Sequence, residues 1–302
     1  MSIDIEAVEY ISRERGIDPA FIEKDWYAVQ VLKALAEFSH DAITVIFTGG
    51  TSLSKGHGLL QRFSEDLDFR ARFDTDTPPN KTKRRSFRND IVGILKAIDG
   101  VDLDENKVDI HGLGFKIFLS YINHFATHDS IRADLQVEFS YTQPRLGSDI
   151  KDIISFVAEY KGEEAETNIL CLSPVEIAAD KLSGLIWRVL KRDRASEKDD
   201  PSMIRHLHDL CALRAIIHEN QELFTQTAIS SFAADQERPS RSVDMALSDA
   251  TKKALAILGS DGIYSQEYQQ FVDEVSYADD ESHIDFDATL ENVSGIAELC
   301  FS

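Results

Sequence analysis

Long apolar runs, paired cysteines and an excess of basic residues are all missing from this 302-residue sequence. A transmembrane helix needs roughly 18 or more consecutive apolar residues, so none is expected. The first residues, MSIDIEAVEYISRERG, are acidic and mixed rather than basic and then apolar, so no signal peptide is expected. The three cysteines, Cys171, Cys211 and Cys300, are odd in number, widely spaced and set among apolar residues. This spacing favours reduced core thiols over disulfides or a Cys/His metal site, and we expect a soluble cytoplasmic protein.

Positive charge is scarce as well: 32 Lys and Arg face 53 Asp and Glu, a formal net charge of −21. Such a charge opposes non-specific binding to polyanions, so a nucleic-acid substrate would have to meet a local basic patch. The first candidate cluster is Lys81, Lys83, Arg84, Arg85 and Arg88. The second candidate cluster is Arg188, Lys191, Arg192 and Arg194. For both clusters, ordinary solvated surface is the alternative interpretation.

A composition of 43% hydrophobic and 28% charged residues predicts a sizeable core in one large or two modest domains. Apolar spacing predicts strands at 42–47, 64–69, 107–110, 114–122 and 130–141. It predicts helices at 4–15, 18–38, 84–98, 174–192, 223–232, 243–258, 264–277 and 288–301. We therefore expect N-terminal helices over 1–39, an α+β core over 40–165 and a helical C-terminal domain over 170–302.

The stretch 42–70, AITVIFTGGTSLSKGHGLLQRFSEDLDFR, holds the clearest chemical pattern. A buried strand ends at Gly49 and Gly50, where the backbone can turn tightly and approach a ligand. Thr51 and Ser52 are expected to cap the following helix, whose free N–H groups would face a phosphate.

Acidic residues alternate along two of the predicted strands. Period 2 places Ser64, Asp66 and Asp68 on one face, and two such carboxylates form a hard oxygen site suited to Mg²⁺. A two-metal phosphoryl-transfer site needs a third carboxylate, and the strand over 130–141 offers Glu138 or, on the same face, Asp134. A solvated acidic face is the alternative interpretation.

The order strand, Gly-Gly-Thr-Ser, helix and Asp-x-Asp resembles the DNA polymerase β-type nucleotidyltransferase superfamily. The motifs GGTSLSK and RFSEDLDF resemble the AbiEii/AbiGii toxin family, to which the mycobacterial MenT toxins also belong. The resemblance implies a nucleotidyltransferase core, a mixed sheet flanked by helices, with a helical C-terminal domain. It implies Mg²⁺-dependent transfer of a nucleotide from an NTP to an acceptor, with tRNA as the expected RNA, by a phage-defence toxin that has a cognate antitoxin. It implies that Glu138 binds the metal together with Asp66 and Asp68 and that Ser64 has a catalytic role. It implies nucleotide binding by Gly49, Gly50, Thr51, Ser52 and Lys55.

Two further motifs lie in the predicted helical domain. SPVE at 173–176 is a capping box with Pro174 at the first helical position. In that helix VEIAADKLSGLIWR resembles the family's third motif, which implies that Lys181 contacts nucleotide phosphate or supports the chemistry; a snorkelling surface lysine is the alternative. RHLHDL resembles the fourth motif and implies that Asp209 orients Lys181 or the active site, whereas helix spacing alone would pair it with Arg205.

Several nearby residues are expected to be structural. His206 and His208 have no spacing that makes a metal site. The charged run Glu23–Tyr27 is similar to a motif near the start of AbiEii-like proteins, and we expect it to support packing. Two rival functions remain. A catalytically silent NTP-binding regulator would not need three carboxylates, and a metal-dependent nuclease would not need the Gly-Gly cradle.

Overall fold

The computed structural model describes residues 2–64, 66–75, 77–112, 114–126, 131–277 and 284–301. The chain divides into two compact units. The first consists of Met1–Gly58 with Arg62–Leu172, and the second of Leu59–Gln61 with Ser173–Ser302. The main division between the units falls after Leu172, a few residues beyond the boundary expected between 165 and 170. None of the helices in the described ranges is long and apolar enough to cross a lipid bilayer.

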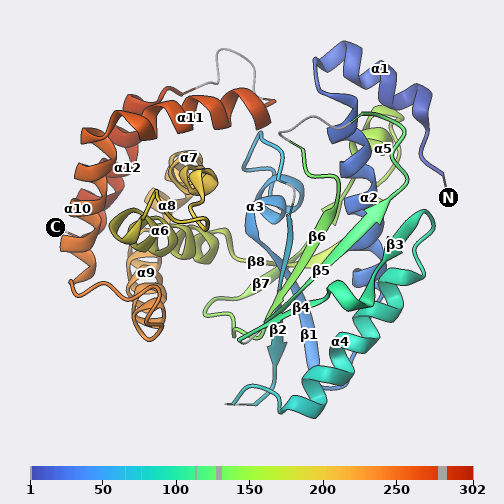
Figure 1. The fold of residues 1–302 in the computed structure, drawn as a ribbon, viewed down its shortest axis with the longest axis horizontal. Coiled ribbons are helices and arrows are strands. Elements are labelled where there is room, and N and C mark those ends of the chain that lie inside the picture. The colour runs from blue at the N-terminus through green and yellow to red at the C-terminus, as the bar shows by residue number, and fades with distance from the viewer. Residues whose placement is uncertain are drawn as a thin grey trace. The chain divides into compact units, whose positions relative to one another are not determined.

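A mixed sheet forms the centre of the first unit (Figure 1). Its strands are β1 (Ile43–Thr48), β2 (Asp66–Phe73), β3 (Val101–Leu103), β4 (Asp109–His111), β5 (Gly114–Tyr121), β6 (Leu135–Ser140), β7 (Ser148–Ile153) and β8 (Thr167–Leu172). Among the described residues these form one sheet in the order β3-β5-β6-β2-β1-β8-β7, with β4 paired to β5. The helices of this unit are α1 (Ile5–Arg15), α2 (Pro19–Ala36), α3 (Gly49–Thr51), α4 (Lys81–Lys96) and α5 (Phe156–Tyr160), with π-helix η1 (Ser52–Gly56) and 3-10 helix η2 (Glu105–Lys107). The predicted mixed sheet flanked by helices is confirmed.

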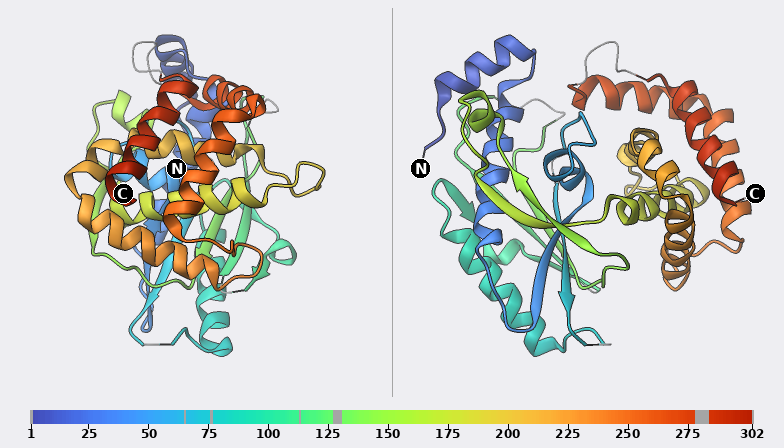
Figure 2. Two further views of the ribbon diagram at one scale, coloured as in Figure 1. Left: turned by 90° about the vertical axis from the view of Figure 1, so that its left-hand side faces the viewer. Right: turned by 180° about the vertical axis from the view of Figure 1, so that it is seen from behind.

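The two faces of this sheet differ in chemistry. Aromatic rings from neighbouring strands lie side by side on one face, with centroid distances of 5.3 Å for Phe47–Phe69, 5.0 Å for Phe69–Phe139 and 4.9 Å for Phe115–Phe139. Phe87 of α4 packs edge-on against Phe115 and Phe139, and Figures 1 and 2 show α2 and α4 along this same side. Because strand side chains alternate, the opposite face receives Asp66, Asp68 and Glu138. Packing on one face therefore fixes the acidic residues on the other.

Some elements differ from the prediction. Strands β7 and β8 were not expected, and the strand expected at 107–110 is instead a 3-10 turn followed by β4. The strand expected at 130–141 begins at Leu135; residue 130 lies outside the described residues. The helix expected after the double glycine is three residues long and continues as the π-helix η1.

The second unit is helical in its described residues. Its elements are α6 (Pro174–Lys191), 3-10 helix η3 (Pro201–Ile204), α7 (Arg205–Ala212), α8 (Arg214–Glu219), α9 (Gln221–Gln236), α10 (Leu247–Ser260), α11 (Gly262–Val275) and α12 (Phe286–Phe301). Helix α6 is surrounded by α7, α9 and α10, so most of its surface is buried. Pro174 stands at its start as predicted, but Ser173 makes no side-chain cap and Glu176 is buried, so the expected capping box is wrong.

Candidate active site

The double glycine at the end of β1 lies in close contact with polar side chains, including Asp68. Gly49 has a φ of +78°, and a Cβ placed there would lie 2.2 Å from Asp68 Oδ2. A Cβ on Gly50 would lie 2.8 Å from both Arg62 Nη2 and Ser64 Oγ. At Gly49 both the backbone conformation and the close approach of Asp68 require glycine, whereas at Gly50 only the close approach of two side chains favours it. Arg62, Ser64 and Asp68 converge on this bare backbone.

Thr51 and Ser52 do not cap a helix, so that expectation is wrong. Thr51 Oγ1 donates to the backbone carbonyl of Asp66 at 2.6 Å, and Ser52 Oγ donates to the carbonyl of Phe47 at 3.4 Å. Both side chains are buried against the sheet, where strand carbonyls are the available acceptors. They fix the end of β1 and the start of β2, which is where the acidic residues begin.

Strand register distinguishes between the two candidates for the third carboxylate. Strands β2 and β6 are parallel, with Asp68 opposite Glu138 and Asp66 opposite Gln136. Asp134 precedes β6 and takes no part in this ladder. Glu138 is thus the acidic residue beside Asp68 on the polar face.

Three basic side chains that sequence reasoning did not assign to the site contact these carboxylates. Lys116 Nζ lies 3.0 Å from Glu138 Oε2, and His111 Nε2 lies 3.7 Å from Glu138 Oε1. Arg132 Nη1 lies 3.3 Å from Asp66 Oδ1. Lys116 could have been found, because strand alternation at 114–122 puts it opposite the apolar Phe115 side and β5 pairs it with Glu138. Arg132 lies outside any strand of the described structure; alternation along the strand predicted at 130–141 puts it on the face of Glu138 but does not indicate its contact with Asp66.

The two aspartates are the residues that fit a cation best. Among the described residues, Asp66 Oδ1 is buried without a hydrogen-bond partner, although Arg132 Nη1 lies 3.3 Å from it, and Asp68 Oδ2 lies against Gly49. Oxygen ligands of this kind suit Mg²⁺. Among the residues that the structure describes, no group of three or more His, Cys, Asp or Glu side chains is placed to hold a metal ion. Glu138 would have to exchange Lys116 for the metal, so its metal role stays a prediction.

Lys55, predicted to bind nucleotide, is engaged within its own unit. Its Nζ lies 2.5 Å from Asp25 Oδ1, donates to the carbonyl of Ile154 at 3.3 Å and stands 4.0 Å from the ring centroid of Phe156. Burial raises the pKa of Asp25, and the Lys55 ammonium opposes that rise. Asp25 also accepts a hydrogen bond from the Phe156 N–H at 2.9 Å. The motif lysine therefore ties η1 to helix α2 and the β7–α5 connection.

The neighbouring charges of α2 hold other segments of the same unit. Glu23, which is 1% exposed, accepts hydrogen bonds from the backbone N–H of His124 at 3.1 Å and contacts its Nδ1 at 2.6 Å. Lys24 Nζ donates to the carbonyl of Arg132 at 2.9 Å. Arg132 is the residue that meets Asp66. The expected structural role of the Glu23–Tyr27 run thus includes support of the acidic face.

The first basic cluster lies at the start of α4. Lys81, Lys83 and Arg85 are exposed, Asn80 caps the helix, and the Arg84 guanidinium stands 5.2 Å from the Tyr141 ring. This helix follows the far end of β2, five residues beyond Asp68, or about 16 Å along the strand (Figure 1). Closeness in sequence to the Asp-x-Asp motif is therefore not closeness to the carboxylates, and a role in RNA binding stays a prediction.

Lys181 and Asp209 meet inside the helical unit. Lys181 Nζ lies 2.6 Å from Asp209 Oδ2, with side-chain exposures of 8% and 0%, and His208 Nδ1 lies 3.2 Å from Asp209 Oδ1. Asp209 thus pairs with Lys181 of α6 and not with Arg205 of its own helix. Lys181 is neither a snorkelling surface residue nor a lone buried charge. Its contact with nucleotide phosphate stays a prediction.

Comparisons with known proteins found a family-model match and a similar solved structure. A family model described as "Nucleotidyl transferase AbiEii toxin, Type IV TA system" matches residues 30–292. Among solved structures, the chain is similar to MenT4, a nucleotidyltransferase toxin from Mycobacterium tuberculosis H37Rv, with 16% identity, 99% of each chain covered and a TM-score of 0.55. That likeness shows the fold. No curated protein matches the sequence.

Proposed function

We propose that this chain, which belongs to the AbiEii family of nucleotidyltransferase toxins of type IV toxin–antitoxin systems, transfers a nucleotide from an NTP to RNA. The expected acceptor is tRNA, the expected location the cytoplasm and the expected role phage defence under control of a cognate antitoxin. The observation that carries the transfer reaction is the seating of Asp68 on Gly49, beside Asp66 and opposite Glu138. A nuclease or a silent regulator would need only part of this arrangement.

Asp66 and Asp68 would hold Mg²⁺. When bound, the ion would neutralise phosphate charge and lower the pKa of the attacking hydroxyl. The aspartates fit because Asp66 Oδ1 lacks a hydrogen-bond donor and both carboxylates share one strand face.

The other residues of the polar face would act on the substrate by position and charge. The bare backbone of Gly49 and Gly50 leaves room for a phosphate to approach, since any side chain there would displace Asp68 or Ser64. Arg62, which is buried, places its guanidinium against Gly50 and donates to the Phe63 carbonyl at 2.8 Å. Thr51 holds the start of β2 through the Asp66 carbonyl, so the aspartate pair is positioned before substrate arrives.

A labelling experiment tests this function. The protein is incubated with each labelled NTP, Mg²⁺ and total RNA, and the acceptor that gains label is identified. Asp68→Asn should abolish labelling while circular dichroism shows an unchanged fold, because Asn keeps the shape and loses the charge. Asp102→Asn, on the exposed middle of β3, is the matched control and should label at the wild-type rate.

The outcomes separate the rival functions. Shortened RNA without label would indicate a metal-dependent nuclease, and NTP binding without either product would indicate a silent regulator. Wild-type turnover by Asp68→Asn would refute the assignment of the metal-binding face.

A further inference from the structure

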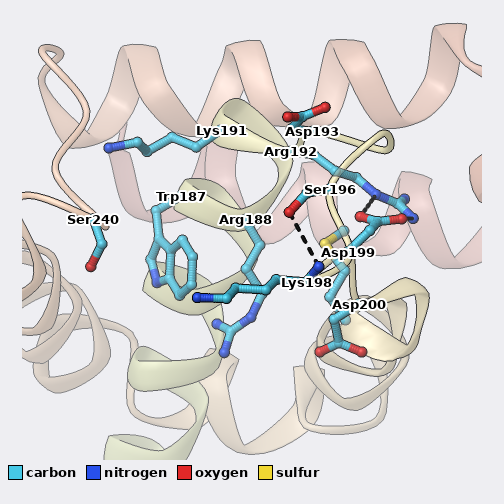
Figure 3. A pocket seen from close by; sticks show the side chains of 11 residues that line it. Trp187, Arg188, Lys191, Arg192, Asp193, Ser196, Lys198, Asp199, Asp200 and Ser240 are labelled. Atoms are coloured by element: carbon cyan, nitrogen blue, oxygen red, sulfur yellow. Dashed lines mark hydrogen bonds and ion pairs between the residues drawn. The ribbon is translucent and has the colours of Figure 1, made fainter.

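A pocket of about 250 Å³ lies wholly within the helical unit, between the end of α6, the loop after it and η3. Figure 3 shows Trp187 and Arg188 side by side on α6, with Lys198 extending from the loop toward the indole ring. The Arg188 guanidinium stands 4.2 Å from the Trp187 ring centroid, and that of Arg241 stands 5.3 Å from it. The ring thus orders two cations in one place.

Most other charges of the second basic cluster are already paired. Arg192 bonds Asp199 and Glu267 at 2.7 to 2.9 Å, and Arg194 Nη1 lies 2.7 Å from Asp261. Both arginines are therefore paired with acids, but only Arg194, whose side chain is 33% exposed, fits the interpretation as solvated surface, because the Arg192 side chain is 6% exposed.

Several remaining charges near the pocket are also engaged. Lys191 Nζ donates to the carbonyls of Pro239 and Ser242 at 2.9 and 3.0 Å. Of the lining aspartates, Asp193 accepts from a backbone N–H in its own loop and Asp200 accepts from the Ser202 hydroxyl. In the described part of the chain, the Lys198 ammonium has no hydrogen bond or ion pair, and Arg188 makes no ion pair, although the charges of Asp200 and Asp235 raise its pKa.

Arg188 uses little of its hydrogen-bonding capacity. In the described part of the chain, its guanidinium makes one hydrogen bond, from Nη1 to the carbonyl of Gly184 at 3.2 Å, out of five N–H donors. A Cβ at Gly184 would lie 3.0 Å from that nitrogen, so a glycine leaves room for the guanidinium to lie on the helix. Burial, and then the charge of Arg205, lower the pKa of Arg188 to about 10.

Other polar groups around Arg188 also lack partners. Within the described residues, the side chain of Arg205 makes no hydrogen bond or ion pair. Both ring nitrogens of His206 and the indole Nε1 of Trp187 are buried without a hydrogen-bond partner. His206 lies beside Arg188, since its Nε2 is 3.6 Å from the same Cβ position over Gly184. Buried donors without acceptors are uncommon in native proteins and call for an explanation.

We propose that Arg188 and Arg205, with Trp187 and His206 beside them, bind the phosphate group of a nucleotide or an RNA strand. Among the described residues neither guanidinium makes an ion pair, and the charge of Arg205 lowers the pKa of Arg188 more than the charges of Asp200 and Asp235 raise it individually. A guanidinium fork matches phosphate oxygens, and an anion would relieve the repulsion between the two arginines. This site is independent of the carboxylates of the first unit and needs no metal.

Intrinsic fluorescence provides a direct test. The chain has two tryptophans, so Trp26→Phe leaves Trp187 as the sole reporter. Emission is followed in EDTA, which removes Mg²⁺-dependent binding, while tripolyphosphate, ATP or a short 5′-phosphorylated RNA is added. Saturable change is expected, and Arg188→Gln should weaken apparent affinity roughly 10- to 100-fold through loss of charge-assisted hydrogen bonds. Arg194→Gln, which removes an arginine already paired with Asp261, should leave it unchanged.

The three probes identify the source of the phosphate. Equal affinity for tripolyphosphate, ATP and RNA indicates a free nucleotide, whereas tighter binding of RNA indicates a strand. No saturable change with any probe, or equal weakening by Arg188→Gln and Arg194→Gln, would overturn the proposal. If Trp26→Phe does not fold, titration calorimetry in EDTA can measure the affinity of the wild-type chain and of each Gln variant for the same three probes, with the same expected outcomes. Because binding is measured without transfer, failure here is distinct from failure of the proposed reaction.

Discussion

Replacing Gly49 with alanine tests how the acidic face is built. The added methyl would sit 2.2 Å from Asp68 Oδ2, so the carboxylate has to retreat by about 1 Å to reach ordinary contact. A displacement of that size in a reacting group can cost about 100-fold in rate. The substitution therefore acts on activity through one defined carboxylate.

The effect on stability has two parts that a control can separate. Gly49 has φ +78° and Gly16 has φ +66°, so alanine at either position adopts the left-handed region at a cost of about 1–2 kcal/mol. No atom lies within 4 Å of a Cβ at Gly16, whereas Gly49 also meets Asp68. Overpacking should add about 1–3 kcal/mol for Gly49→Ala alone.

Urea unfolding and NTP-dependent RNA labelling measure the two effects. Gly16→Ala should lose stability and keep the wild-type labelling rate under conditions where it is folded. Gly49→Ala should lose more stability and about 100-fold in rate. A wild-type rate in Gly49→Ala, or an equal rate loss in Gly16→Ala, would refute the seating of Asp68 on the glycine as the basis of activity.

Three other perturbations have defined outcomes. Lys181→Met should lower the free energy of unfolding by about 3–5 kcal/mol in urea titrations, because Asp209 stays buried without its cation; Lys181→Met/Asp209→Leu should regain stability but not transfer. Burial lowers the pKa of His206, so the unfolded state binds more protons; stability should fall by about 1.4 kcal/mol between pH 7.5 and 5.5, and His206→Leu should reduce this loss. The third perturbation is the triple alanine substitution of Lys83, Arg84 and Arg85 in α4. It should weaken RNA labelling and reduce the slope of log activity against log salt concentration by about one per lost phosphate contact. An unchanged salt series would show that the RNA binds elsewhere.

Local patterns in the sequence predicted the centre of the fold well. Period 2 located Asp66 and Asp68 on one face of β2, and the apolar run before Gly49 located β1, because each of these depends on a few adjacent residues. Strand β7 was missed because Ser148–Ile153 is polar and largely exposed at the sheet edge, where no apolar alternation is required.

Contacts that depend on the whole topology were beyond sequence reasoning. Arg132 meets Asp66 across 66 positions, and nothing near either residue indicates the other. The cap expected from Thr51 and Ser52 failed because both hydroxyls donate to backbone carbonyls of the sheet instead of accepting from the N–H groups of a helix end. Register decided between Glu138 and Asp134, and register is a property of two strands together.

The charged run on α2 has a consequence for the order in which the molecule becomes organised. Glu23, Lys24 and Asp25 bond to partners 101, 108 and 131 positions further along the chain. Contacts that close such long loops form only after much entropy has been lost, so they belong to the late stages of folding. In a chain emerging from the ribosome, these three contacts can form only after residues 124, 132 and 156, respectively, have been made. Detachment of α2 would break all three contacts at once.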